Sequence, residues 1–198
     1  MSRERPILFS GSMVRAILAG QKTVTRRTVR DVPQWVARTG PDPFGATLYS
    51  FNADRIEHVR SPYGIPGDRL WVRETWRPDS SHDPDDTRYR ADYQGNEYND
   101  VRDMLPWRPS IFMPRTRSRI TLEVVNIRVE RLHAITEEDA IREGVDAVSV
   151  ADVPRNGTLS RRDDFAQLWQ KINGKRAPWG SNPFVWRIEF RRVEVHRG

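Results

Sequence analysis

The sequence contains no cysteine, which excludes disulfide bonds and any mechanism that needs a thiolate. Histidine is scarce as well: His58, His82, His133 and His196 are scattered, with no spacing typical of metal ligands or of a catalytic triad. No apolar run approaches the roughly 18 residues that a membrane-spanning helix needs. We therefore expect no metal, no other cofactor and no membrane attachment, and the missing cysteine favours a cytoplasmic protein.

Lysine is the next scarce residue. Of the 33 basic residues, only those at positions 22, 171 and 175 are lysine, and the other 30 are arginine. A desolvated lysine can give up its proton, whereas arginine in practice cannot. Because Lys22 stands in the dense polar run Lys22-Thr-Val-Thr-Arg-Arg27, we interpret it as a candidate base. A surface lysine that happens not to be arginine is the alternative.

The charge balance of the 198 residues points to an anionic partner. The formal net charge is +6, which favours a nucleotide-like ligand or nucleic acid, although arginine spread over the whole surface would give the same total. We expect a nucleoside or nucleotide-like small molecule, with RNA as a further candidate. The oligomeric state stays open. Seven tryptophans and seven phenylalanines supply apolar area for the core of one domain spanning 1–198.

Hydrophobic periodicity predicts an α+β fold. Alternation indicates strands over 5–9, 69–76, 119–132 and 184–191, and a spacing of three to four indicates helices over 12–19, 135–144 and 160–174. In the last helix the expected core stripe is Phe165, Leu168, Trp169 and Ile172. A phase slip at Val124-Val125 predicts a bulge in a long strand. This order of elements predicts a small, mostly antiparallel β-barrel with helices packed on its outside and ends.

Two segments, 31–66 and 77–114, show no sustained period and are rich in proline, glycine and aspartate. We interpret them as insertions that lie outside the barrel. The first is expected to be a loop with a short strand at 48–51, and the second to hold a strand at 89–93. Trp107, Ile111 and Phe112 are expected to pin the returning chain to the core.

The first helix is expected to begin at an N-cap, Ser12, and to end at Gly20 in a left-handed conformation. Two turns are too short to be stable alone, so this helix must dock on a core and hold the polar run after it. In a straight strand Lys22 and Thr25 would point to opposite faces. Their side chains can meet only if Lys22 lies in the turn after Gly20.

The second helix carries a carboxylate in an unfavourable place. Thr136 is the expected N-cap, Asp139 its capping-box partner and Gly144 the stop. Glu143 then lies at the negative end of the helix dipole, which would raise its pKa and suit a proton donor. A frayed, exposed glutamate is the alternative.

Five motifs together resemble the ASCH domain of the PUA-like β-barrel superfamily. They are Pro6-Ile-Leu-Phe-Ser, Ile17-Leu-Ala-Gly-Gln-Lys-Thr-Val-Thr-Arg-Arg, Pro66-Gly-Asp-Arg-Leu-Trp-Val-Arg-Glu-Thr-Trp, Ile135-Thr-Glu-Glu-Asp-Ala-Ile-Arg-Glu-Gly and Trp186-Arg-Ile-Glu-Phe. The match leaves out both insertions. The family includes small bacterial amidohydrolases that remove the acetyl group of N4-acetylcytidine. The resemblance implies a catalytic set of Lys22, Thr25 and Glu143. The residues alone point to the same three, because a hydroxyl such as that of Thr25 is a poor nucleophile until a base such as Lys22 takes its proton, and a carboxyl group can then orient the base or protonate the leaving nitrogen.

The resulting hypothesis is hydrolysis of an N4-acylated cytosine nucleoside or a related small amide. Thr25 would be the nucleophile or would position water, Lys22 its base, and Glu143 the group that orients Lys22 or protonates the leaving nitrogen. Further residues expected to bind substrate, whether by stabilising the oxyanion, stacking on the base or lining the site, are Ser10, Arg26, Trp71, Arg73, Glu74 and Trp76. The alternative is a non-catalytic reader of RNA or modified nucleotides, or a ribonuclease, that uses the same residues, with Arg26, Arg27 and Arg73 as phosphate contacts.

Overall fold

The computed structural model describes residues 3–30, 38–42, 45–52, 55–78, 86–93, 106–145 and 160–193. Its strands are β1 (Glu4–Leu8), β2 (Val24–Thr28), β3 (Arg38–Asp42), β4 (Gly45–Asn52), β5 (Arg55–Arg60), β6 (Arg69–Arg73), β7 (Trp76–Pro78), β8 (Thr87–Tyr89), β9 (Thr121–Arg131) and β10 (Phe184–Val193). Its α-helices are α1 (Gly11–Leu18), α2 (Glu137–Arg142) and α3 (Arg161–Asn173). Its 3-10 turns are η1 (Arg90–Asp92), η2 (Ser110–Phe112), η3 (Arg115–Arg117), η4 (Leu132–Ala134) and η5 (Trp179–Ser181).

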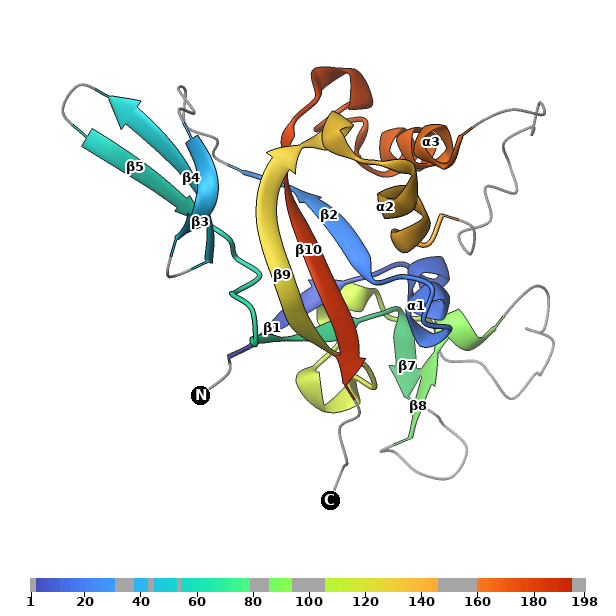
Figure 1. The fold of residues 1–198 in the computed structure, drawn as a ribbon. Helices are drawn as coiled ribbons and strands as arrows, with labels where there is room; N and C mark the ends of the chain where they lie inside the picture. Colours follow the sequence, from blue (N-terminus) through green and yellow to red (C-terminus); the bar gives the residue numbers. More distant parts are fainter. Residues whose placement is uncertain are drawn as a thin grey trace.

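The central element is a five-stranded sheet with the order β1-β6-β9-β10-β2 (Figure 1). Only β1 and β6 run parallel, and the other neighbours are antiparallel. The α+β class with a mostly antiparallel sheet is therefore confirmed. The expected closure is not seen: β1 and β2 are the two edge strands and do not pair with each other in the described chain.

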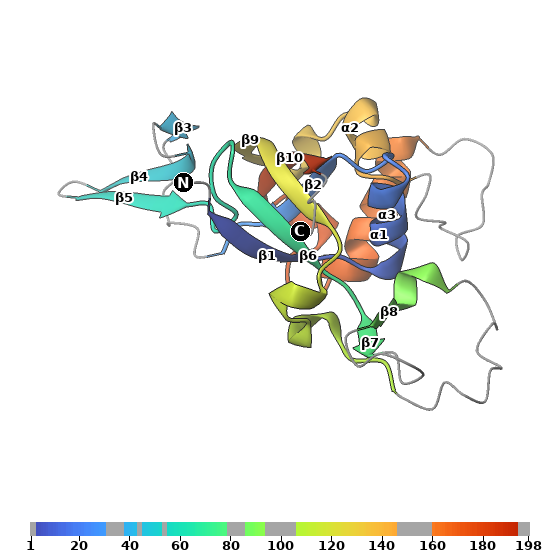
Figure 2. The ribbon, with the colours of Figure 1, turned by 90° about the horizontal axis from the view of Figure 1, so that it is seen from below.

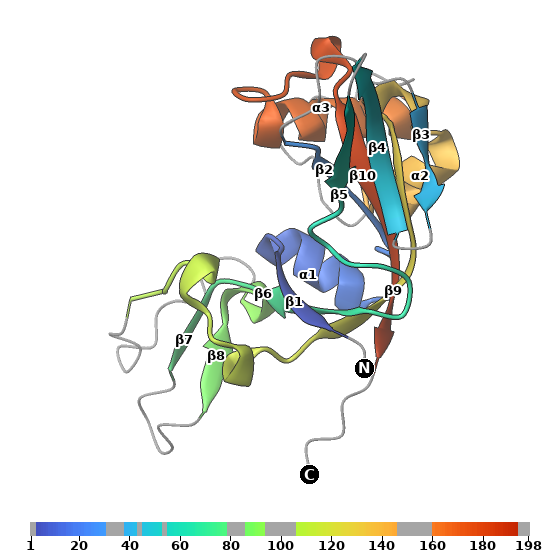
Figure 3. The same cartoon turned by 90° about the vertical axis from the view of Figure 1, so that its left-hand side faces the viewer.

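Apolar side chains cover both faces of this sheet. One core cluster includes Ile7 of β1, Val72 of β6 and Trp186 of β10, and α1 packs into it through Val14 and Ile17. A second, smaller cluster lies between the sheet and the pair α2 and α3. Figure 3 shows α2 and α3 towards one end of the long strands and α1 beside β1. The sheet thus packs against α1 through the first cluster and against α2 and α3 through the second.

The predicted bulge in the long strand is confirmed. Glu189 of β10 pairs with Asn126 of β9, whereas the next residue, Phe190, pairs with Val124. Val125 is left without a partner on β10, and 46% of it is exposed. The extra residue restores the inward direction of the apolar side chains after the phase slip.

Both insertions contain more regular structure than expected. The first was predicted to be a loop, and this is wrong, because β3, β4 and β5 form a three-stranded antiparallel sheet. The expected strand at 48–51 lies within β4 and is confirmed. Figures 1 and 2 show this second sheet projecting from the side of the central one, and β3 and β4 contact β9.

In the second insertion several expectations are wrong. The strand predicted over 69–76 ends at Arg73, and Trp76 begins the separate hairpin β7–β8. The strand expected at 89–93 is instead the single turn η1. Ile111 and Phe112 are 56% and 66% exposed, and the neighbouring Met113, fully buried, anchors the return of the chain.

The helix ends are partly as predicted. The N-cap of α1 is Ser10 rather than Ser12, since the Ser10 hydroxyl accepts from the Met13 amide. Ser160 and Asp163 form a full capping box on α3. In α3 Phe165 and Trp169 are buried, but Ile172 is 54% exposed, so the predicted stripe is shorter than expected.

Residues 79–85 and 146–159 lie outside the described residues. Across the part of the chain that the structure describes, no helix combines the length and the apolar character needed to cross a bilayer.

Candidate active site

The turn between α1 and β2 places Lys22. Gly20 has φ of +73°, the left-handed conformation that glycine adopts without steric cost. The amides of Gln21 and Lys22 both donate to the Ala16 carbonyl, at 2.9 and 3.0 Å, and so wrap the chain around the helix end. Lys22 therefore lies in the turn after Gly20 and not in the strand. This is the position that the sequence required if Lys22 and Thr25 are to act together.

Lys22 is buried, with 2% of the residue exposed. Its Nζ donates to Glu143 Oε2 at 2.7 Å, to the Glu143 carbonyl at 2.8 Å and to the Val24 carbonyl at 2.9 Å. These acceptors occupy all three donors of an ammonium group. Burial lowers the pKa of Lys22 below its ordinary value of 10.5, and the ion pair with Glu143 opposes this shift. The surface-cation alternative is therefore excluded.

Glu143 follows the last residue of α2 and is 4% exposed, so the alternative of a frayed, exposed glutamate is wrong. One carboxylate oxygen accepts from Lys22, and the other accepts from Arg26 Nη1 at 3.3 Å. The next residue, Gly144, has φ of +78°. A Cβ there would lie 3.1 Å from the Cβ atoms of both Ala16 and Lys22. Glycine is thus needed at this position for α2 to approach the α1–β2 turn.

Arg26 is neutralised by carboxylates on every side. Its side chain is fully buried, with Glu130 at 2.7 Å, Glu143 at 3.3 Å and Asp139 in direct contact. A guanidinium enclosed in this way cannot turn to hold an oxyanion. We therefore revise its expected role: Arg26 orients the Glu143 carboxylate.

Asp139 links α2 to the sheet. Besides Arg26, its carboxylate accepts from Arg187 Nη2 at 2.7 Å and Nε at 3.0 Å. The Thr136 cap is confirmed at 3.1 Å, but the Asp139 carboxylate bonds these two arginines in place of the expected capping-box amide. Burial opposes its charge, yet the hydrogen bonds from Arg187 and Arg26 lower the pKa of Asp139 far below its usual range.

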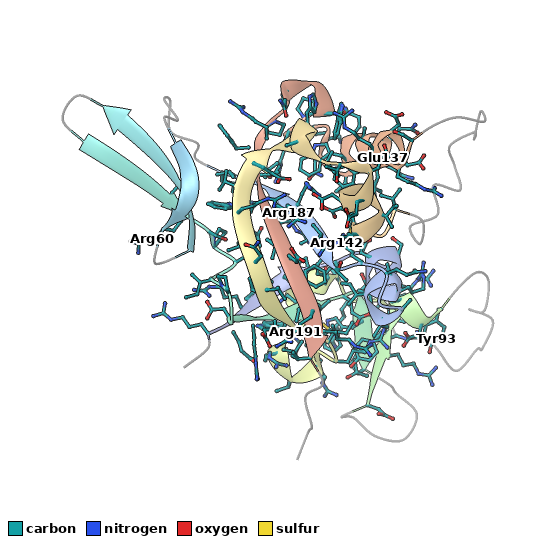
Figure 4. The ribbon with its side chains drawn as sticks, viewed as in Figure 1. Arg60, Tyr93, Glu137, Arg142, Arg187 and Arg191 are labelled. Carbon is teal, nitrogen blue, oxygen red and sulfur yellow. The ribbon has the colours of Figure 1, made fainter. Side chains whose placement is uncertain are left out.

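The network of ion pairs also includes Glu189 of β10. Arg187 of β10 and Arg142 of α2 both pair with Glu189, and Figure 4 shows the two arginines where α2 covers the sheet. Sequence reasoning missed Asp139 and Arg187 as site residues. One signal was present in the sequence: Arg187 is a charged residue with apolar neighbours on both sides, Trp186 and Ile188. In the structure it pairs with Arg26 in the register of β2 and β10.

Thr25 and Arg26 are consecutive in β2, so their side chains lie on opposite faces of the strand. Thr25 pairs with Ile188 of the main core, whereas Arg26 pairs with Arg187. Thr25 is 3% exposed, and within the described chain its hydroxyl makes no hydrogen bond. It directly follows Val24, whose carbonyl accepts from Lys22. The structure thus joins Lys22 to Glu143 by direct contact and places Thr25 one peptide away from that pair.

The aromatic residues of the Trp-Val-Arg-Glu-Thr-Trp segment are not brought to this pair. Leu70 and Val72 belong to the core, so alternation along β6 turns Trp71 and Arg73 to the opposite face. The Arg73 guanidinium lies 4.7 Å from the centre of the Trp71 ring. Trp76 is 4% exposed, with a guanidinium (that of Arg108) 5.2 Å from its ring centre.

Two further expected residues, Glu74 and Ser10, have other partners. Glu74 is 1% exposed and accepts from Arg119 at 2.9 and 3.1 Å, while Arg119 also binds Asp92 at 2.8 Å. Burial raises the pKa of Glu74 despite the opposing effect of Arg119. The Ser10 hydroxyl caps α1 and lies 3.1 Å from the Ser12 hydroxyl. Neither residue contacts Lys22 or Glu143 through any interaction in the described chain.

Among the described residues no group of three histidine, aspartate or glutamate side chains is placed to hold a metal ion. Comparison of the chain with protein-family models, with curated proteins and with solved structures found no match. The site that the described residues form consists of a buried Lys22–Glu143 pair, an arginine that contacts the glutamate, and the nearby Thr25.

Proposed function

We propose that this chain is an amidohydrolase of the ASCH type that removes the acyl group from an N4-acylated cytosine nucleoside or a related small amide. Membership of the PUA-like superfamily, with its closed barrel, is part of the proposal. The observation that carries it is the contact between the buried Lys22 and Glu143, 121 residues apart in the chain, with Lys22 also bonded to the carbonyl of Val24, the residue before Thr25. A buried lysine paired with a carboxylate and next to a hydroxyl is a recurrent arrangement for activating a nucleophile.

The first chemical requirement is a lone pair on Lys22. Its Nζ is 2.7 Å from Glu143 Oε2, so one proton can move along that hydrogen bond and leave a neutral amine facing a carboxylic acid. Burial lowers the pKa of Lys22 and so favours the neutral amine.

The neutral amine serves Thr25. Lys22 takes the hydroxyl proton as Thr25 Oγ1 attacks the amide carbon, and the leaving N4 nitrogen takes the proton held by Glu143 as the carbon–nitrogen bond breaks. The proton that Lys22 took then returns along the hydrogen bond to Glu143, so that Lys22 can take a proton from the water that attacks the threonine ester while Glu143 protonates Thr25 Oγ1 as the ester bond breaks. Arg26 keeps the Glu143 carboxylate directed at Lys22 through its 3.3 Å contact.

A reader of RNA or modified nucleotides is the second candidate. It is favoured by the three occupied donors of Lys22 Nζ, which together suit a permanently charged lysine that locks the turn in place. The two candidates differ in whether the lysine must lose its proton. A lysine that only stabilises the turn needs its positive charge, whereas a lysine that acts as a base needs its lone pair.

The test is turnover of a panel of N4-acylcytidines, followed by ultraviolet absorbance. Wild-type protein should deacylate at least one of them. Lys22→Arg and Lys22→Ala should both abolish turnover, and Lys171→Arg, at an exposed lysine of α3, should leave it unchanged. Thermal unfolding of each variant controls for the fold. Near-normal turnover by Lys22→Arg would remove the catalytic assignment, and RNA binding without turnover of any acylcytidine would favour the second candidate.

A further inference from the structure

Arg27 differs from the other cations of this region. Lys22, Arg26 and Arg187 each have at least one carboxylate within 3.3 Å. Arg27 has no ion pair with any carboxylate of the described chain. Its Nε is buried and lacks a hydrogen-bond partner, and its one hydrogen bond goes to a neutral acceptor, the Leu8 carbonyl.

An uncompensated guanidinium that is partly buried is costly to fold. Burial disfavours the charge, and only the Tyr63 hydroxyl and Glu143 lie near enough to favour it. Neither of these groups makes a hydrogen bond or an ion pair with Arg27 in the described residues. Because a bound anion would supply the missing counter-charge, the arrangement suits a ligand-binding arginine better than a purely structural one.

The position of Arg27 relates this charge to the proposed catalytic pair. Its guanidinium carbon lies 5.1 Å from the centre of the Phe9 ring, and Lys22 Nζ lies 5.8 Å from the same centre. Arg27 also stands two residues after Thr25 in β2, so the two side chains share one face of the strand. Its side chain reaches across the open edge of the sheet, from β2 to β1.

We propose that Arg27 binds a phosphate group of the ligand, and that the protein takes a cytosine nucleotide in preference to the free nucleoside. This inference rests on the proposed function for the identity of the base. A guanidinium held against an aromatic ring with unused donors matches the oxygens of a phosphate. Of the adjacent arginines that the sequence offered as phosphate contacts, Arg26 is already neutralised by carboxylates, whereas Arg27 has no ion pair in the described chain.

The test measures binding rather than turnover. Titration calorimetry with cytidine monophosphate and with cytidine should show about tenfold tighter binding of the nucleotide by the wild-type protein. Arg27→Gln should bring the two affinities within about twofold of each other. Arg191→Gln removes the same charge from a side chain on β10 that is 68% exposed, and it should keep the full preference.

Three outcomes would overturn the proposal: equal affinity of the wild-type protein for the two ligands, an undiminished preference in Arg27→Gln, or affinity only for an RNA oligonucleotide. If Arg27→Gln does not fold, the wild-type comparison decides alone, together with the loss of the nucleotide preference at high salt. Nucleotide preference without deacylation would refute the proposed hydrolase and leave this site standing. Deacylation that is indifferent to a 5′-phosphate would refute this site and leave the hydrolase standing.

Discussion

The most informative perturbation is Glu143→Gln. It keeps the shape of the side chain and the backbone acceptor at this residue but removes the negative charge that faces Lys22. The Lys22 side chain is fully buried and that of Glu143 is 5% exposed, so solvent screens neither partner. Lys22 then remains as a buried cation whose remaining acceptors are the neutral carbonyls of Val24 and residue 143.

Removing one partner of a buried ion pair typically costs about 3–5 kcal/mol. We expect the lower end, about 3 kcal/mol at pH 7, because two of the three hydrogen bonds of Nζ survive and Arg26 keeps Glu130 and Asp139. For a chain of this size each kcal/mol shifts the melting temperature by about 2–4 °C. The expected loss is therefore roughly 6–12 °C.

The sign of the pH dependence follows from Lys22. In the variant the contribution of Glu143 that raises the pKa of Lys22 is absent, so the folded-state pKa falls further below 10.5 than in the wild type. At pH values between the folded-state pKa of Lys22 and its unfolded-state pKa, the unfolded chain keeps a proton that the folded protein has released, so stability rises with pH. The difference between variant and wild type should thus shrink as the pH increases from 7 towards 10.

The assay is urea unfolding of both proteins at several pH values, since the difference cancels the titration of all other groups. Adding Lys22→Met to Glu143→Gln removes the stranded charge and should recover about 1–2 kcal/mol, less than the full loss because the two carbonyls lose their donor. A loss below about 1 kcal/mol, the same at every pH, would refute the reasoning. So would a double variant whose loss is the sum of the single losses.

Three further predictions concern neighbouring positions. Gly144→Ala should cost about 1–3 kcal/mol more than Gly67→Ala in chemical unfolding, because both glycines have positive φ but only at 144 does the new Cβ meet atoms at 3.1 Å; equal losses would contradict this. Asp139→Asn should destabilise the protein above about pH 4, and its difference from the wild type should shrink steadily as the pH falls below about 4, because the depressed pKa of Asp139 adds stability that is lost as the pH falls towards its folded-state value; a difference that is the same at about pH 6 and about pH 2 would count against it. Thr25→Ala should abolish turnover yet lower stability by only about 1 kcal/mol, since its hydroxyl makes no hydrogen bond in the described chain; retained turnover would remove its assigned role.

The parts of the site that follow from local rules were predictable from the sequence. Gly20 and Gly144 stand at positions where the chain needs positive φ, and both end their helices as expected. The break in alternation at Val124-Val125 located the bulge in β9. Each of these features depends only on residues a few positions apart, so the pattern in the sequence contains the information.

The three-stranded sheet of the first insertion was not predictable in this way. Its strands carry glycine and proline, as at Gly40 and Pro41 of β3, and no regular alternation distinguishes them from a loop. Each of these strands pairs with the strand next to it in the sequence, and the backbone hydrogen bonds that stabilise the pairs do not depend on the order of the side chains. Composition therefore indicated an insertion but not its secondary structure.

The sequence by itself determined the three helices, most strands of the central sheet, the bulge in β9 and the unusual lysine at position 22. Only the tertiary structure decided which charges meet: that Glu143 is buried against Lys22, that Arg26 is neutralised by carboxylates from β9 and from the region of α2, and that Arg27 is not. It also separated Trp71 and Arg73 from the pair by turning them to the other face of β6. The physical reason is that burial and pairing of a charge depend on contacts between residues far apart in the chain, and a local pattern does not contain those contacts.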